Sequence, residues 1–134
     1  MTQLALLVET SRKTAATPSR TAKVAELAAC LRSLAQDEIE IGVAFLTGET
    51  RQGRIGAGYT LLRAARMGSA AESPSLTLAD VDAAFAAFFA ARGSGSSARR
   101  AQLLGGLFAR ATSAEQDFLV RLIVDELRQG ALAA

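Results

Sequence analysis

A glycine- and serine-rich stretch that ends in two arginines is the part of the sequence best suited to bind an anion. Residues 93–100 are Gly-Ser-Gly-Ser-Ser-Ala-Arg-Arg. Glycines let a backbone approach an anion closely, and N–H groups at the start of a following helix favour negative charge. The alternative is a flexible loop with an ordinary serine cap. The candidate anion-binding residues here are Gly95, Ser96, Ser97, Arg99 and Arg100.

A second stretch of the same kind lies earlier in the chain. Residues 17–23 are Thr-Pro-Ser-Arg-Thr-Ala-Lys. Ser19 and Lys23 lie 77 positions before Ser96 and Arg100. This match strengthens the anion-binding hypothesis for both stretches, and it adds Ser19, Arg20 and Lys23 to the candidates.

The two stretches open two copies of one internal repeat. The matched positions in the first copy are Ser19, Lys23, Leu27, Leu31, Glu38, Ile41, Phe45 and Leu46, and those in the second are Ser96, Arg100, Leu104, Phe108, Glu115, Phe118, Leu122 and Ile123. Self-similarity of this kind indicates one supersecondary unit used twice. Two copies would present two basic edges, which suits a ligand that itself repeats, such as a sugar–phosphate backbone.

Each copy closes with the pattern Glu-x-Arg-Gln-Gly, at residues 49–53 and 126–130. A turn arginine beside a glycine can reach a phosphate, which makes Arg51 and Arg128 second-tier candidates. The alternative is that these arginines cap helix C-termini or pair with Glu49 and Glu126. Both can hold if the glutamate orients the arginine.

No catalytic constellation is visible. The sequence has no histidine, which removes the commonest general base and metal ligand. The single cysteine, Cys30, lies in an apolar stretch and is expected to be an inert core thiol. Glu38 and Glu115 are expected to stabilise helix starts and not to act as catalytic acids. The acidic residues show no metal-site spacing.

Length and composition indicate one all-helical domain. The 134 residues are half apolar, rich in alanine and poor in aromatics. The net charge is only +2, but thirteen of the fifteen basic residues are arginine, which suits bidentate phosphate contacts. No export leader and no membrane span are evident, so we expect a cytoplasmic protein.

The apolar pattern predicts the helices that would carry the candidate residues. Residues 4–9 are expected to be a short helix or an extended lead-in, and residues 10–16 a polar connector. Thr17 is expected to cap a helix with Pro18 at its first position, and Val24 is expected on the buried face of that helix. Asp37 is expected to cap the next helix.

A short helix is expected over residues 59–67, ended by Gly68. Capping boxes are expected at residues 77–80 and 112–115. Phe85, Phe88 and Phe89 are expected to be core anchors. The domain boundaries that follow are a lead-in at 1–16 and a helical domain at 17–134.

In their order along the chain, several segments resemble the N-terminal DNA-binding domain of ATP-dependent DNA ligases of bacterial and archaeal type. The segments are residues 17–24, 46–49 with 55–58, 76–82, 93–100 and 114–132. The last is the most specific. Asp125 stands where the family usually has glycine, which leaves the path of the final turn open.

The resemblance implies an all-helical domain that grips nicked duplex DNA through its phosphates without reading base sequence. It also implies that the domain continues beyond residue 134 and that catalytic domains of the same polypeptide are partners. The family's adenylated lysine belongs to a Lys-x-Asp-Gly motif. That motif is absent here, because the only lysines, Lys13 and Lys23, are followed by Thr-Ala-Ala and Val-Ala-Glu. ATP and magnesium are therefore expected only in the catalytic domain. The alternative function is a helical protein-interaction module without DNA binding.

Overall fold

Helices make up the regular structure of the described chain, as the alanine-rich apolar pattern predicts. The structure is a computed structural model, and it describes residues 1–53, 55 and 57–124. The helices are α1 (Leu4–Ala16), α2 (Arg20–Arg32), the short 3-10 helix η1 (Gln36–Glu38), α3 (Ile39–Leu46), α4 (Tyr59–Ala65), α5 (Leu78–Ala90), α6 (Ser96–Ala109) and α7 (Ser113–Ile123). Within these residues the structure has no strand, only an isolated bridge between Gln3 and Thr77. None of these helices has the length and hydropathy of a membrane span.

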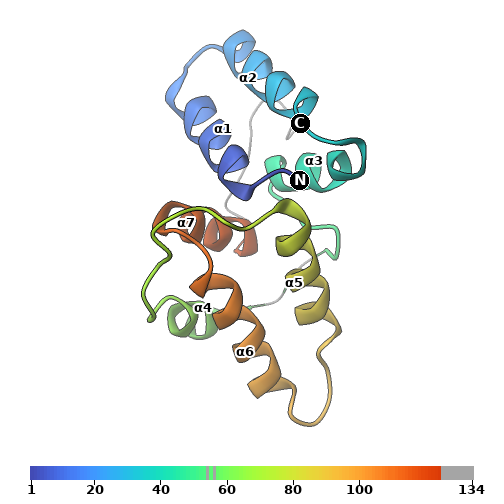
Figure 1. Ribbon diagram of the computed structural model, residues 1–134, viewed down its shortest axis with the longest axis vertical. Coiled ribbons are helices and arrows are strands. Elements are labelled where there is room, and N and C mark those ends of the chain that lie inside the picture. The colour runs from blue at the N-terminus through green and yellow to red at the C-terminus, as the bar shows by residue number, and fades with distance from the viewer. Residues whose placement is uncertain (54, 56, 125–134) are drawn as a thin grey trace.

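The internal repeat appears in the packing of the helices. In the first half of the molecule (α1 to α3) the α1 helix packs on α2, as α5 packs on α6 in the second half (α5 to α7) (Figure 1). The two halves also contact each other, because α1 contacts α7 and α3 contacts α5. Leu27 and Leu104, matched in the two copies, are each only 2% exposed. This correspondence supports the prediction that one helical unit is used twice.

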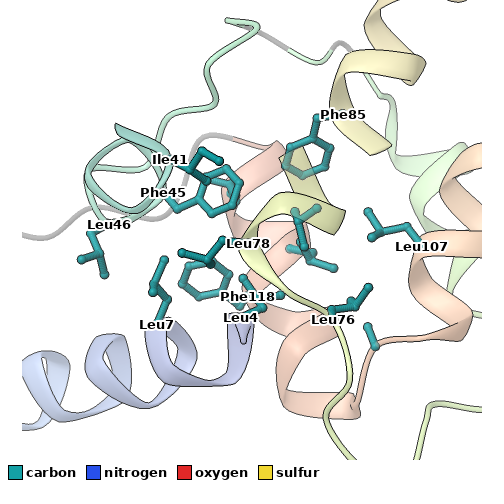
Figure 2. Packing of buried hydrophobic residues seen from close by; sticks show 14 of the residues in the cluster. Leu4, Leu7, Ile41, Phe45, Leu46, Leu76, Leu78, Phe85, Leu107 and Phe118 are labelled. Carbon is teal, nitrogen blue, oxygen red and sulfur yellow. The ribbon is translucent and has the colours of Figure 1, made fainter. Parts of the chain in front are cut away.

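One apolar core joins both halves. Leu4 and Leu7 of α1 point into the same cluster as Phe45 and Phe118 (Figure 2). All four side chains are at most 4% exposed. The first helix is therefore part of the core around which the later helices pack.

The predicted polar connector at residues 10–16 is wrong, because α1 continues through Ala16. Its hydroxyl side chains are buried and bonded to the helix itself. Thr10 Oγ1 donates to the carbonyl of Leu6 at 2.9 Å, and Thr14 Oγ1 donates to the carbonyl of Ser11 at 2.9 Å. A hydroxyl that bonds its own helix can be buried at low cost.

The predicted start of the second helix is also wrong. Thr17 ends α1 in an extended conformation, as the residue before a proline prefers. The N-cap of α2 is Ser19, whose Oγ accepts a hydrogen bond from the N–H of Ala22 at 3.2 Å. The turn after α1 therefore moves the helix start two residues beyond the predicted cap.

Two apolar side chains that were predicted to be buried lie at the surface. Val24 is 47% exposed and Phe89 is 40% exposed. Phe85 and Phe88, at 1% exposure each, are core anchors as expected. Asp37 was predicted to cap a helix, but it lies inside η1. The residue before η1 is Ala35, and its N–H donates to the carboxylate of Glu38.

The capping boxes of α5 and α7 are confirmed. Thr77 Oγ1 accepts from the N–H of Asp80, and the N–H of Thr77 donates to Asp80 Oδ2, both at 3.0 Å. Thr112 and Glu115 exchange the same two bonds at 3.2 and 2.8 Å. Glu115 thus stabilises a helix start, as does Glu38 in the first half.

Candidate nucleic-acid interface

The two predicted basic stretches both lie at helix starts, but they are far from each other. The first turn of α2 and the first turn of α6 lie at opposite ends of the molecule's longest axis (Figure 1). The structure therefore does not gather the candidate cations into one patch. It presents two separate cationic ends.

The α2 start has an exposed arginine and a partly exposed lysine. Arg20 and Lys23 have no carboxylate within ion-pair distance among the residues described. Ser19 uses one lone pair of its hydroxyl for the N-cap bond, so its proton stays available to donate. The remaining N–H groups of the first turn add a partial positive charge.

The α6 start is shaped by two glycines in the left-handed region. Gly93 has φ +85° and Gly95 has φ +80°, a conformation that favours glycine. As the N-cap of α6, Gly95 has no side chain that could accept the first-turn N–H groups. Ser97 and Arg99 are exposed, and Ser96 is partly buried. No ion-pair partner of Arg99 is found in the described part of the chain.

Arg100 is held in place by neighbours from two other segments. Its guanidinium centre lies 4.3 Å from the centroid of the Phe88 ring. Its Nη2 donates to the carbonyl of Ile55 at 3.4 Å, and its buried Nε has no hydrogen-bond partner among the described atoms. Arg100 is thus a preorganised cation that remains partly exposed.

A pocket of about 400 Å³ opens beside Arg100 at the turn between α5 and α6. Its lining residues are Ile55, Phe89, Ala91, Arg92, Gly93, Ser96 and Arg100. Arg92 lies with its guanidinium centre 5.1 Å from the Phe89 ring centroid. The sequence analysis did not include Arg92 among the candidate residues. Its position, shortly after Phe88 and Phe89 and directly before Gly93, could have indicated it.

Arg51 is engaged with carboxylates of the protein. Its Nε and Nη2 donate to the two carboxylate oxygens of Asp82 at 3.2 Å each, and its Nη1 lies 3.6 Å from Glu40. Gln52 adds a bond to Asp82 Oδ1 at 3.2 Å. The pairing hypothesis named Glu49 as the partner of Arg51, but the partners are Asp82 and Glu40. Arg128 lies outside the described residues.

Other arginines are also neutralised locally. Arg12 pairs with Glu9, Arg66 with Asp117 and Arg110 with Asp80. The hydrogen bond and charge of Arg12 lower the pKa of Glu9. The basic residues of the two helix starts have no described carboxylate partner, and the same holds for Lys13, Arg32, Arg63, Arg92 and Arg121.

The single cysteine and the acidic side chains show no metal site in the described chain. Cys30 is buried, as expected, and burial raises the pKa of its thiol. In residues 1–53, 55 and 57–124 no three acidic or cysteine side chains come together as a metal site would require. Among the described residues, the cations and first-turn N–H groups of the two helix starts are the groups best suited to bind an anion.

Comparison with known proteins identifies the family. Residues 59–134, more than half of the chain, match the family described as "DNA ligase N terminus". The chain belongs to this DNA ligase family. Similar relatives are each named "Probable DNA ligase": that of Saccharopolyspora erythraea is 52% identical over 98% of this chain, that of Anaeromyxobacter sp. (strain Fw109-5) is 51% identical over 97%, and that of Mycobacterium marinum is 50% identical over 95%.

The match covers only part of each ligase relative. It spans 26% of the Saccharopolyspora protein and 25% of the other two. The chain therefore corresponds to about a quarter of the length of the curated relatives it matches. The start of α6 lies inside the range matched by the family, residues 59–134, and the start of α2 lies before that range.

Proposed function

We propose that this chain is the DNA-binding module of an ATP-dependent DNA ligase. It holds duplex DNA through the phosphate groups and does not read base sequence. Membership of the DNA ligase N-terminus family supports the ligase assignment. The phosphate-binding part of the proposal rests on the chemistry of the two helix starts.

The observation that carries the proposal is that each half has two basic residues near the start of one helix, of which Lys23 and Arg100 stand at equivalent positions of the repeat. Arg20 and Lys23 stand in the first turn of α2, and Arg99 and Arg100 are the fourth and fifth residues of α6. A duplex offers phosphates at regular intervals along both strands. Two cationic ends joined by one helical core fit such a ligand better than they fit a single small anion.

The donors at these ends can position DNA but cannot distinguish base pairs. Arginine binds a phosphate through two parallel N–H bonds, and serine hydroxyls and first-turn N–H groups add neutral donors. Contacts to phosphates fix register and orientation without sequence information. We therefore expect similar affinity for duplexes of different sequence. Nicked duplex is the substrate that a ligase role implies.

The chemical step belongs to other parts of the ligase polypeptide. Adenylation needs a Lys-x-Asp-Gly motif, which this sequence lacks. ATP and magnesium would be bound by the catalytic domains, which are the expected partners of this module. Such a ligase would serve DNA replication, repair and recombination. It would work in the cytoplasm, where the chromosome of the bacterial relatives lies.

The test is duplex binding by variants that remove charge from the helix starts. We expect the triple substitution Arg20→Ala, Lys23→Ala and Arg99→Ala to weaken binding of a labelled nicked duplex about a hundredfold near 0.1 M salt, because three phosphate contacts are lost. A control, Arg32→Ala with Arg121→Ala, removes two charges from the last turns of α2 and α7. It should change the affinity only slightly.

An equal loss in the control would mean that net charge and not position governs binding. An unchanged affinity in the triple variant would show that the helix starts do not contact DNA. Absence of DNA binding by the unaltered chain, together with salt-insensitive binding to a protein, would favour the alternative of a helical interaction module.

A further inference from the structure

Among the described residues, no further helix covers an apolar face between α2 and α3 in the first half of the molecule, which we call the α2–α3 face. It consists of Leu31 on α2 and of Ile39 and Val43 on α3. Ile39 is 41% and Val43 38% exposed, and Leu31 is partly buried. The two helices are in contact here, because a Cβ built on Gly42 would lie 3.9 Å from Leu31 Cδ2. Ile39 and Val43 lie one turn apart, beside that crossing.

The equivalent face of the second half is covered. The 77-residue interval matches Leu31 with Phe108, Ile39 with Gln116 and Val43 with Val120. Phe108 is 0% and Gln116 5% exposed, and Val120 is packed against the core. The same position in the repeat is thus closed in one half and open in the other.

The cover in the second half is α4 together with the connector that follows it. The α4 helix packs on α6. Arg66, the C-cap of α4, pairs with Asp117 at 2.7 Å, and further along the connector the N–H of Ala71 donates to the carbonyl of Ala111 at 2.9 Å. The first-half counterparts of Asp117 and Ala111 are Glu40 and Leu34, which border the α2–α3 face.

The two halves therefore exchange segments crosswise. The α4 helix follows the first half along the chain but covers the second. By the same relation, a segment that follows the second half would cover the first. The ligase relatives are about four times as long as the stretch that matches this chain, so polypeptide for such a segment exists in them.

We propose that the α2–α3 face binds a short amphipathic helix, the counterpart of α4, from the continuation of the same ligase polypeptide. Adding the 77-residue interval to the bounds of α4, Tyr59–Ala65, places this helix at positions 136–142. The inference rests on the family and the repeat, and it does not depend on DNA binding.

The pattern of α4 defines the chemistry of the expected occupant. Leu62 is 2% exposed, Leu61 and Ala65 are packed against the core, and Tyr59 and Arg63 are exposed. The counterpart should carry large apolar residues at positions 138 and 139 and a small one at 142. A basic residue at position 143 would then reach Glu40, whose side chain is 77% exposed and which would share its charge between that residue and Arg51.

The first test is a cross-link within the complete polypeptide. Val43→p-benzoylphenylalanine, placed in the complete ligase and irradiated, should cross-link within one molecule to positions 136–143. Met67→p-benzoylphenylalanine is the control, because Met67 is 83% exposed and outside the α2–α3 face. Cross-links from position 43 to a second molecule or to another region would overturn the proposal. An open reading frame that stops at residue 134 would overturn it as well.

The second test is hydrogen exchange, which reports local protection. The amides of α3 should exchange at least about tenfold more slowly in the complete polypeptide than in the chain of residues 1–134. Ile39→Asp with Val43→Asp should remove this difference, whereas Met67→Asp should keep it. Equal exchange of α3 in the two unaltered proteins would show that nothing in the continuation covers the face.

Discussion

Arginine side chains in this protein serve two purposes. Arg51 is tied to Asp82 by two hydrogen bonds, so its charge helps to hold the 49–53 turn against α5. Arg99 is exposed and has no carboxylate partner in the described residues. Arg100 lies between these cases, since an aromatic ring and a carbonyl orient it without cancelling its charge. The difference between these arginines lies in their neighbours and not in the local sequence.

The Arg51–Asp82 pair leads to a prediction that separates a structural role from a DNA-binding one. Asp82 has a side chain only 12% exposed, so its carboxylate needs a partner. We expect Arg51→Ala to lower the free energy of unfolding by about 1–3 kcal/mol, measured by urea unfolding, because it leaves a buried acceptor poorly satisfied. Affinity for duplex DNA should change less than twofold. A large loss of DNA affinity with unchanged stability would instead place Arg51 at a phosphate.

Glu38 is the clearest buried acid in the first half. The N–H and hydroxyl of Thr2 donate to its two carboxylate oxygens at 2.7 Å each, and the N–H of Ala35 donates at 3.1 Å. These bonds, led by the Thr2 N–H, hold the pKa of Glu38 below its ordinary 4.5, against the opposing effect of burial. Because the folded pKa is lowered, the stabilisation is present above 4.5 and is lost as pH falls through the folded pKa.

A pH-dependent stability difference is therefore expected for Glu38→Gln. At pH 7 this substitution should lower the free energy of unfolding by about 1–3 kcal/mol, because it removes charge-assisted bonds. The difference from the unaltered protein should shrink as the pH is lowered to 3. Denaturant unfolding at both pH values measures it, with the exposed Asp37→Asn as the control. A difference that stays constant between pH 7 and 3 would contradict this account.

At the scale of helices, the local sequence explains where a helix begins, and contacts between residues distant in sequence explain which face of a helix is buried. The capping boxes of α5 and α7 were predictable, because a threonine and an acid three residues later satisfy each other without outside help. The length of α1 was not, because its polar hydroxyls are buried only where α2 packs over them. Val24 and Phe89 are exposed for a related reason, since periodicity alone does not tell which face finds a partner.

The candidate site was predictable to a similar extent. The spacing of serine and basic residues located both basic stretches, although the start of α2 was predicted two residues too early. The Asp82 partner of Arg51 lies 31 residues away and the Phe88 partner of Arg100 lies 12 away, so only the fold brings them together. The separation of the two cationic ends along the longest axis also needed the structure (Figure 1).

Two glycines inside α6 give an element-scale prediction. A Cβ at Gly105 or Gly106 would meet nothing within 4 Å among the described atoms, so neither is required by packing there. We expect Gly105→Ala and Gly106→Ala each to raise the free energy of unfolding by about 0.5–1 kcal/mol, because alanine favours a helix over glycine. The midpoint of urea unfolding measures this gain.

The control for this prediction is Gly42→Ala in α3. Its Cβ would lie 2.4 Å from Leu34 Cδ1, so a buried side chain must move and the helical gain should be cancelled or reversed. Equal stabilisation at Gly42 and Gly106 would mean that the packing of Leu34 against Gly42 is looser than the structure indicates.

At the scale of the whole molecule, the repeat links architecture to function. Each half contributes one basic helix start, and the shared core of α1, α3, α5 and α7 fixes the distance between them. A ligand that contacts both ends must itself be long and charged. Duplex DNA meets both conditions, and it requires no catalytic group from this chain.

The most direct measurement is the salt dependence of duplex binding. Each neutralised phosphate contributes about −0.9 to the slope of log K against log salt concentration. Four cations, Arg20, Lys23, Arg99 and Arg100, predict a slope of about −4 for the unaltered chain. The triple alanine variant at Arg20, Lys23 and Arg99 should give about −1, and the Arg32 and Arg121 control should stay near −4. A slope near zero for the unaltered chain, or one that the triple variant leaves unchanged, would contradict the claim that the two helix starts hold the DNA backbone.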